Sequence, residues 1–137
     1  MRVLIKVMQE TYSNYKELCT KILQLNPNIR FVGIINSNGR LVASSAKDKI
    51  KFHVGERDGE ILFMEIALRT RMLEEFNFCL GQMNFSIYHR EFLITMEFPL
   101  ENETIFVSAE KEIDLDEMPF QIIEIIRKKN ILYNIVN

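Results

Sequence analysis

The chain has 137 residues, of which 47% are hydrophobic and 26% charged, and its formal net charge is −2. This length suits a single domain, and the composition excludes an intrinsically disordered chain and a disulfide scaffold. A near-neutral, slightly acidic domain is also a poor candidate for a general nucleic-acid binder.

The first helix is predicted from Ser13 to Leu25, where apolar residues recur at spacings of three and four. Apolar residues continue back towards Arg2, so the start of this helix is less well defined. Pro27 ends it, because the residue before a proline is pushed out of the helical region.

A β-hairpin follows the first helix. Its strands are predicted at Ile29–Ile35 and Arg40–Ser45, and the segment Asn36–Gly39 between them contains Asn-Gly, the strongest short-range hairpin signal. The polar segment from Lys47 to Asp58 is predicted to be a loop, whose small cluster of basic residues we interpret as solvated.

The strongest helical pattern runs from Gly59 to Leu80, and Gly81 stands where a helix C-terminal cap is expected. Three strands are predicted after it, joined by short connections that imply an antiparallel meander. They are Gln82–Tyr88, Phe92–Phe98 and Thr104–Ala109. A last helix is predicted after Asp116, a plausible N-cap.

This order, α-β-β-α-β-β-β-α, predicts an α+β domain that spans residues 1–137, with a five-stranded antiparallel sheet flanked by helices. It resembles the roadblock family (dynein light chain roadblock-like), which has a profilin-like fold. The most specific local match is the hairpin segment Phe31–Ser44. The chain is also similar to small uncharacterised archaeal proteins with the segments Asn26–Phe31 and Ala67–Arg69.

The resemblance implies a non-catalytic scaffold or regulator that forms a homodimer, with a protein partner such as a small GTPase. Roadblock-like proteins often dimerise by pairing the strand after the central helix with its symmetry mate. The loop from Lys47 to Asp58 and the tail beyond Lys129 are particular to this chain, so the resemblance places no partner-binding surface here.

The residues support a dimer independently. The strand Gln82–Tyr88 would lie at a sheet edge, and an exposed apolar edge promotes aggregation unless it is paired. The central helix also has more apolar surface than one sheet face needs; this surplus comprises Leu62, Phe63, Ile66 and Phe76. The alternative is that this helix is simply buried within one copy. The expected interface residues are Met83, Phe85, Ile87, Tyr88, Leu62 and Ile66.

No constellation of catalytic, cofactor-binding or metal-ligating residues is apparent. His53 and His89 lack a second ligand at a suitable spacing, and we interpret both as exposed. Cys19 and Cys79 stand alone in apolar patterns and are interpreted as buried apolar side chains. We therefore expect neither an enzyme nor a cofactor.

No apolar run approaches the roughly 20 residues that span a bilayer, and Lys6 interrupts the apolar N-terminal segment. We therefore expect a cytoplasmic protein without a membrane partner.

One alternative function remains open, a PAS-like sensor that binds a small molecule between the sheet and the helices. Its pocket would be lined by Phe31, Met64, Phe85 and Met96. A PAS domain usually has several short helices between its second and third strands, whereas this chain predicts one long helix there and another before the first strand. That difference favours the roadblock-like interpretation.

Overall fold

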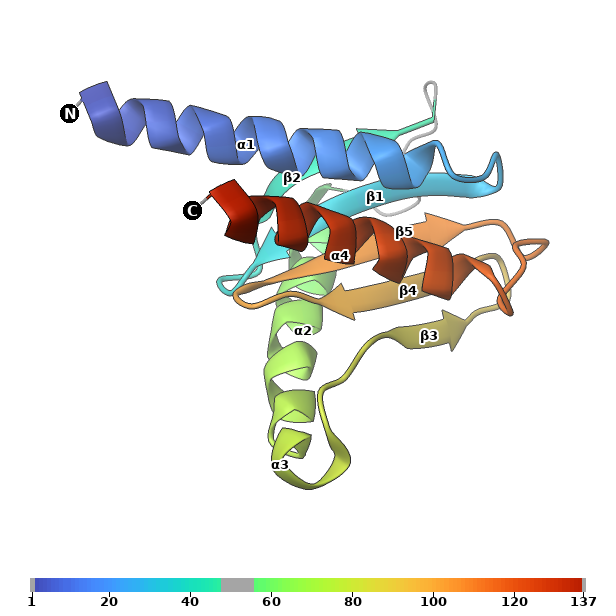
Figure 1. Ribbon diagram of the computed structural model, residues 1–137. Helices are drawn as coiled ribbons and strands as arrows, with labels where there is room; N and C mark the ends of the chain where they lie inside the picture. The colour runs from blue at the N-terminus through green and yellow to red at the C-terminus, as the bar shows by residue number, and fades with distance from the viewer. Residues whose placement is uncertain (1, 48–55, 137) are drawn as a thin grey trace.

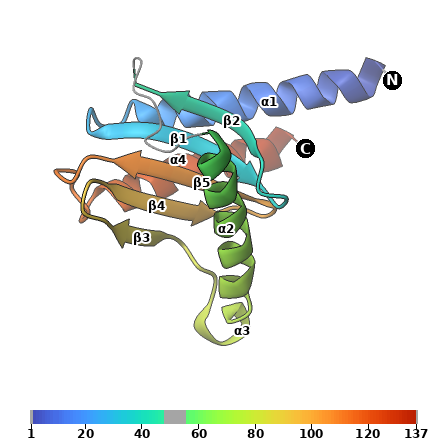
Figure 2. The same ribbon diagram turned by 180° about the vertical axis from the view of Figure 1, so that it is seen from behind.

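The computed structural model describes residues 2–47 and 56–136, which form a five-stranded sheet with helices on both faces (Figures 1 and 2). The predicted loop from Lys47 to Asp58 lies mostly outside the described residues. In chain order the elements are α1 (Arg2–Leu23), β1 (Ile29–Asn36), β2 (Leu41–Ala46), α2 (Glu56–Glu74), α3 (Asn77–Leu80), β3 (Ser86–His89), β4 (Ile94–Pro99), β5 (Glu103–Ala109) and α4 (Met118–Val136). Within the described ranges, no helix combines the length and the apolar character needed to cross a membrane.

The strands lie in the order β2-β1-β5-β4-β3, and every neighbouring pair is antiparallel. The predicted fold class is confirmed, and so is the meander of the last three strands. Val107 of β5 pairs with Val32 on one side and with Met96 on the other, so β5 is the central strand. The two edges of the sheet are therefore β2 and β3.

The two faces of the sheet carry different cores because side chains alternate along each strand. The α1/α4 face holds the larger cluster, in which Val32, Met96, Phe98 and Val107 pack against the helices. On the opposite face a small cluster joins β1 and β5 to α2; its buried members are Ile35, Phe63, Ile66 and Phe106. Figure 2 shows that α2 is the helix of the described chain that lies on this second face.

The β1–β2 turn is fixed both by its own hydrogen bonds and by α2. The side-chain oxygen of Asn36 accepts hydrogen bonds from the backbone N–H groups of Asn38 and Arg40. Gly39 has a φ of +79°, and a Cβ there would lie 2.7 Å from the Cα of Met64 on α2. The turn therefore needs glycine for its backbone conformation and also for the close approach of the helix.

The central helix differs from its prediction because it is not continuous. α2 ends at Glu74, and the separate short helix α3 follows from Asn77 to Leu80. Gly81 then takes a φ of +82° and donates its N–H to the carbonyl of Asn77, which confirms it as a C-terminal cap. The interruption lies where α2 has passed the edge of the sheet and lost its packing surface (Figures 1 and 2).

The strand after α3 is shorter than predicted. It begins at Ser86, which pairs with Glu97, and not at Gln82. Extending the ladder backwards would bring the chain opposite Pro99, which has no N–H group to donate. Residues 82–85 therefore connect α3 to the sheet instead of forming part of it.

Candidate self-association surface

α2 crosses the second face of the sheet and then extends beyond it. Its first half packs on β1 and β5 through Phe63 and Ile66, whereas the end of α2 and all of α3 project past β3 (Figures 1 and 2). A helix that leaves the sheet in this way presents apolar side chains that the rest of the same described chain does not cover.

An apolar stripe runs along the side of α2 that faces away from the sheet. Its members recur at spacings of three and four and are each more than half exposed. We call Ile61, Met64, Leu68, Met72 and Phe76 the α2 stripe. Phe78 and Leu80 of α3 follow the stripe along the chain and are more exposed still, at 87% and 80%. Exposed apolar side chains concentrated in this way make α2 and α3 the candidate surface for an interaction.

The edge strand β3 lies beside the projecting part of α2. Along the described chain it pairs only with β4, so the backbone groups on its other side are available to another strand. Its side chains divide between the faces of the sheet. Phe85, just before the strand, and Ile87 pack against the α1/α4 core, whereas Tyr88 lies on the α2 side, under Arg69.

A partly buried charge pair joins α2 to this edge of the sheet. Arg69 Nη2 lies 2.6 Å from Glu97 Oε2 on β4, and its guanidinium carbon lies 4.7 Å from the centre of the Tyr88 ring. The Glu97 side chain is only 4% exposed, and burial raises the pKa of this carboxyl, while Arg69 opposes the shift. The Arg69 contacts therefore hold α2, β3 and β4 in one arrangement.

The residues predicted for the dimer interface occupy different environments. Ile66 is wholly buried between α2 and the sheet, so its side chain cannot face a second copy, and that part of the expectation is corrected. Leu62 is half-buried against the same cluster, and Phe85 and Ile87 are half-buried on the α1/α4 face. Met83 and Tyr88 are also half-buried, and Met83 precedes the strand instead of belonging to it.

The central helix does carry exposed apolar surface, as expected, but most of the residues that form it differ from those named from the sequence. Of the four named from the sequence, Phe63 joins Ile66 in the core and Leu62 packs beside them, whereas Phe76 lies on the α2 stripe. Met64, Leu68 and Met72 were missed as surface residues. Their regular spacing was visible, but spacing alone does not say which of two apolar lines faces the sheet.

The pocket expected of a sensor does not form from the residues proposed for it. Phe85 and Met96 lie on the α1/α4 face, whereas Phe31 lies on the α2 face, where its ring meets Phe106. Met64 is more than half exposed on the outer side of α2. The sheet itself therefore separates these side chains, so the structure does not favour that alternative.

Comparison with known proteins gives a family and a fold. A family model described as "Family of unknown function (DUF6659)" matches residues 8–133. None of the curated proteins compared with the sequence matches it.

Solved structures resemble the chain over most of its length. A Roadblock/LC7 domain from Streptomyces avermitilis has a TM-score of 0.65 at 7% identity, covering 86% of this chain and 96% of that one. MglB from Myxococcus xanthus has a TM-score of 0.66 at 11% identity, covering 92% of both chains. The gliding protein MglB from Thermus thermophilus also reaches 0.66 at 11% identity, covering 86% of this chain and 89% of that one. The chain has the Roadblock/LC7 fold and belongs to the family of unknown function DUF6659.

Proposed function

We propose that this protein is a non-catalytic interaction module that works as a homodimer and scaffolds or regulates a partner protein. The observation that carries the proposal is the α2 stripe, an exposed apolar surface next to the unpaired edge of β3. Both features are hazards for an isolated copy, and one symmetric contact would remove both.

The geometry of such a dimer follows from the sheet. A two-fold axis perpendicular to the sheet would pair β3 with its symmetry mate in antiparallel fashion and continue the sheet into the second copy. This operation keeps both α2 helices on the same face. Because each α2 projects past its own β3 edge, the projecting parts of the two α2 helices would meet on that face, where apolar side chains of one α2 stripe would pack against those of the other (Figure 2).

The free energy gained by burying the apolar side chains of the α2 stripe is large enough to offset the cost of association. Burying one large apolar side chain is worth about 1.5–3 kcal/mol, and two copies would bury the stripe twice. Association itself costs several kcal/mol, at least about 4. The outer residues Leu68 and Met72 are therefore expected to dominate, because the core-facing Ile66 is already buried before association.

Titratable groups support a non-catalytic assignment. Among the described residues, the clear pKa shifts of acids fall on Glu17 and Glu97, which are ion-paired, and that of a thiol on Cys19, which is buried in the core. Perturbed acids and nucleophiles at catalytic sites usually share one cleft. These three groups lie in separate parts of the fold instead.

The test of the dimer is Leu68→Glu, which places a charge in the middle of the α2 stripe. The matched control is Gln121→Glu, which adds the same charge at an exposed position of α4, on the other face of the sheet. Light scattering after size exclusion should give a dimer for the wild type and the control and a monomer for Leu68→Glu. An unchanged mass for Leu68→Glu, with a native far-UV spectrum, would overturn the proposed interface.

The partner that we propose is a small GTPase, the class that the roadblock resemblance implies. The experiment captures proteins from cells of the source organism on the wild-type protein, with either GDP or a non-hydrolysable GTP analogue present. We expect a GTP-binding protein enriched in one nucleotide state, and reconstitution of the purified pair should reproduce that preference. Capture without any GTP-binding protein would show that this partner class is wrong.

A further inference from the structure

The sheet has two edges, and the dimer proposed above uses only one of them. β3 would pair with its symmetry mate, whereas β2 lies at the opposite edge and pairs, along the described chain, only with β1. An open edge is a template for a strand of another copy. Copies that paired at both edges would add to one another without end, because such an arrangement does not close. An assembly that stops at two chains therefore needs a β2 edge that is closed to strand addition.

The register of the hairpin shows which backbone groups of β2 point outwards. The N–H of Lys47, just after β2, donates to the carbonyl of Arg30 at 3.0 Å. In an antiparallel ladder, bonded positions of this kind alternate with positions whose N–H and C=O groups point away from the neighbouring strand. Counting back from Lys47, the backbone groups of Ser45 and Ala43 face β1, and those of Ser44 face outwards. An added strand would need the Ser44 groups.

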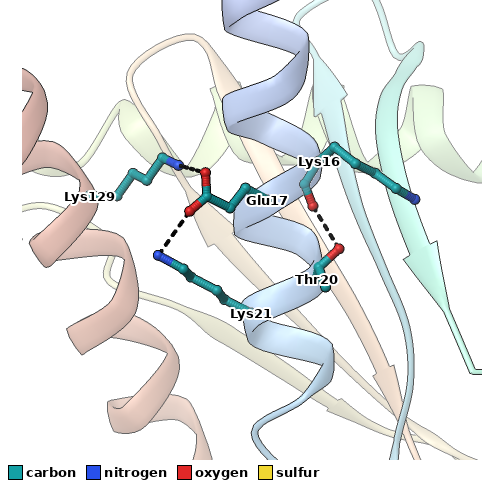
Figure 3. A network of polar contacts seen from close by, with 5 residues as sticks. All are labelled: Lys16, Glu17, Thr20, Lys21 and Lys129. Atoms are coloured by element: carbon teal, nitrogen blue, oxygen red, sulfur yellow. Dashed lines mark hydrogen bonds and ion pairs between the residues drawn. The ribbon is translucent and has the colours of Figure 1, made fainter.

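A side chain of α1 already occupies one of these outward groups. The ammonium group of Lys16 donates a hydrogen bond to the carbonyl oxygen of Ser44. Figure 3 shows the Lys16 side chain directed to the opposite side of α1 from Glu17, which faces α4. The Lys16 charge therefore lies at the edge of the sheet where the next strand would run. A strand that added there would have to displace this donor or desolvate its charge.

Two further features make β2 a poor template. Val42 has no partner in β1, because the register shifts between the pair of Ile34 with Ala43 and the pair of Ile35 with Leu41. Such a bulge interrupts the ladder and twists the edge of a sheet. Residues 43–46 are alanines and serines, whose small side chains offer an added strand little apolar surface to bury.

The β3 edge has a different character. The N–H of Arg90 donates to the carbonyl of Leu93 at 3.0 Å, so the same alternation directs the N–H and C=O of Ile87 outwards. The register of β3 with β4 continues without a shift over four pairs. Among the described residues, the lysine and arginine side chains that donate hydrogen bonds do so to groups outside β3. The β3 edge is thus regular and open.

We propose that Lys16 closes the β2 edge, so that copies of this chain associate only through β3 and α2 and the assembly stops at two chains. The inference rests on the proposed dimer and adds what limits its size. Lysine is a residue that natural sheets use to block an edge. Without the ammonium group, the N–H and C=O of Ser44 would both be open, and the β2 edges of two dimers would pair with each other.

The experiment is sedimentation velocity over a concentration series of the 137-residue chain. Lys16→Met removes the ammonium group and keeps an unbranched side chain. Lys21→Met is the matched control, because it removes the same charge from the side of α1 where Lys21 pairs with Glu17. The wild type and the control should level off at two chains, whereas Lys16→Met should reach at least about twice that mass. The same final mass for Lys16→Met as for the wild type or for Lys21→Met would overturn the proposal.

A second pair of variants shows whether the new contact uses the β2 edge. Ser44→Pro removes the outward N–H and no hydrogen bond of the β1–β2 ladder, a position at which edge strands accept proline. Adding it to Lys16→Met should return the mass to two chains with a native far-UV spectrum. Lys16→Arg keeps both a donor and a charge, so it should behave as the wild type. Larger species in either variant would contradict the role assigned to Lys16.

The same series separates this inference from the proposed dimer. If β3 does not pair, the wild type stays a monomer and Lys16→Met should form a pair of chains, because each copy then has one open edge. Lys16→Met combined with Leu68→Glu should give the same pair. A monomeric wild type with a dimeric Lys16→Met would refute the α2 interface and leave the closure of β2 standing. A dimeric wild type with an unchanged Lys16→Met would refute the closure alone.

Discussion

Arg69 on α2 and Glu97 on β4 form an ion pair of 2.6 Å in which the carboxylate is 4% exposed and the guanidinium side chain 36% exposed. The pair lies on the α2 face of the sheet, next to Tyr88 of the edge strand. It therefore links the stability of one copy to the shape of the surface that we propose for self-association.

Arg69→Met should destabilise the protein by about 1–3 kcal/mol, because it leaves the Glu97 carboxylate buried without its partner. The comparison is Arg30→Met, which leaves the more exposed Glu110 carboxylate unpaired and should cost less than about 1 kcal/mol. Urea denaturation measures both values. Equal losses in the two variants would show that the Arg69 pair has no special structural role.

Glu97 should also make stability depend on pH. Burial raises its pKa above the ordinary value of 4.5, so the folded protein binds this proton more tightly than the unfolded chain does. The resulting stabilisation is fully present below pH 4.5 and is lost as the pH rises through the folded-state pKa.

Glu97→Gln should remove this component of the pH dependence. Its free energy of unfolding, relative to the wild type, should therefore increase from pH 4.5 to about pH 7. Denaturation at several pH values checks the sign, and a constant difference between the two proteins would contradict the assignment.

Gly39→Ala should be more damaging than Gly81→Ala. Both glycines have a positive φ, +79° and +82°, so alanine is strained at either position. A Cβ at Gly39 would also lie 2.7 Å from the Met64 Cα, whereas a Cβ at Gly81 would meet nothing within 4 Å. We expect an additional loss of about 1–2 kcal/mol at Gly39 in thermal or urea unfolding. Equal losses would mean that the turn does not press against α2.

Ile66→Ala and Ile61→Ala separate the two sides of α2. Removing the buried Ile66 side chain leaves a cavity and should cost about 2–5 kcal/mol. Truncating Ile61, which is 52% exposed, should change the stability of an isolated copy by no more than about 0.5 kcal/mol. Denaturation under conditions that keep the protein monomeric gives both numbers. A mild effect at Ile66 would place it outside the core after all.

The two cysteines should differ in reactivity with a thiol reagent. Burial raises the pKa of Cys19 from 9.0 to about 11, whereas Cys79 on α3 is exposed, contrary to the expectation from its apolar pattern. One thiol per chain should therefore react in the native protein near neutral pH, and the second only after unfolding. Cys79→Ser should abolish the fast phase. A native protein in which both thiols react quickly would contradict the packing of α1 on the sheet.

The predictable parts of the fold are those set by local chemistry. The Asn36–Gly39 turn follows from the backbone preferences of its own residues, and Gly81 ends a helix for the same reason. The start of β3 was not predictable, because it depends on Pro99 of the neighbouring strand. The ion pair of Arg69 and Glu97 joins residues 28 positions apart, so a local sequence pattern cannot predict it.

The candidate surface was predicted as a location but not residue by residue. The sequence shows an apolar surplus on the central helix and an edge strand after it, and the structure has both. Because α2 is apolar on two sides, spacing alone assigned Ile66 to the surface, although it is buried. Only the packing of Phe106 and Ile35 against one side decides which line remains outside.

The last turn of α2 and all of α3 project past the edge of the sheet, and no residue of α3 is buried (Figure 2). Their amide protons should thus exchange with solvent deuterium far faster than those over β1 and β5, as long as the copy is alone. A partner that binds to this projecting segment would slow that exchange. The exchange rate of this segment therefore reports whether a partner covers it, and mass spectrometry can measure that rate without any substitution in the protein.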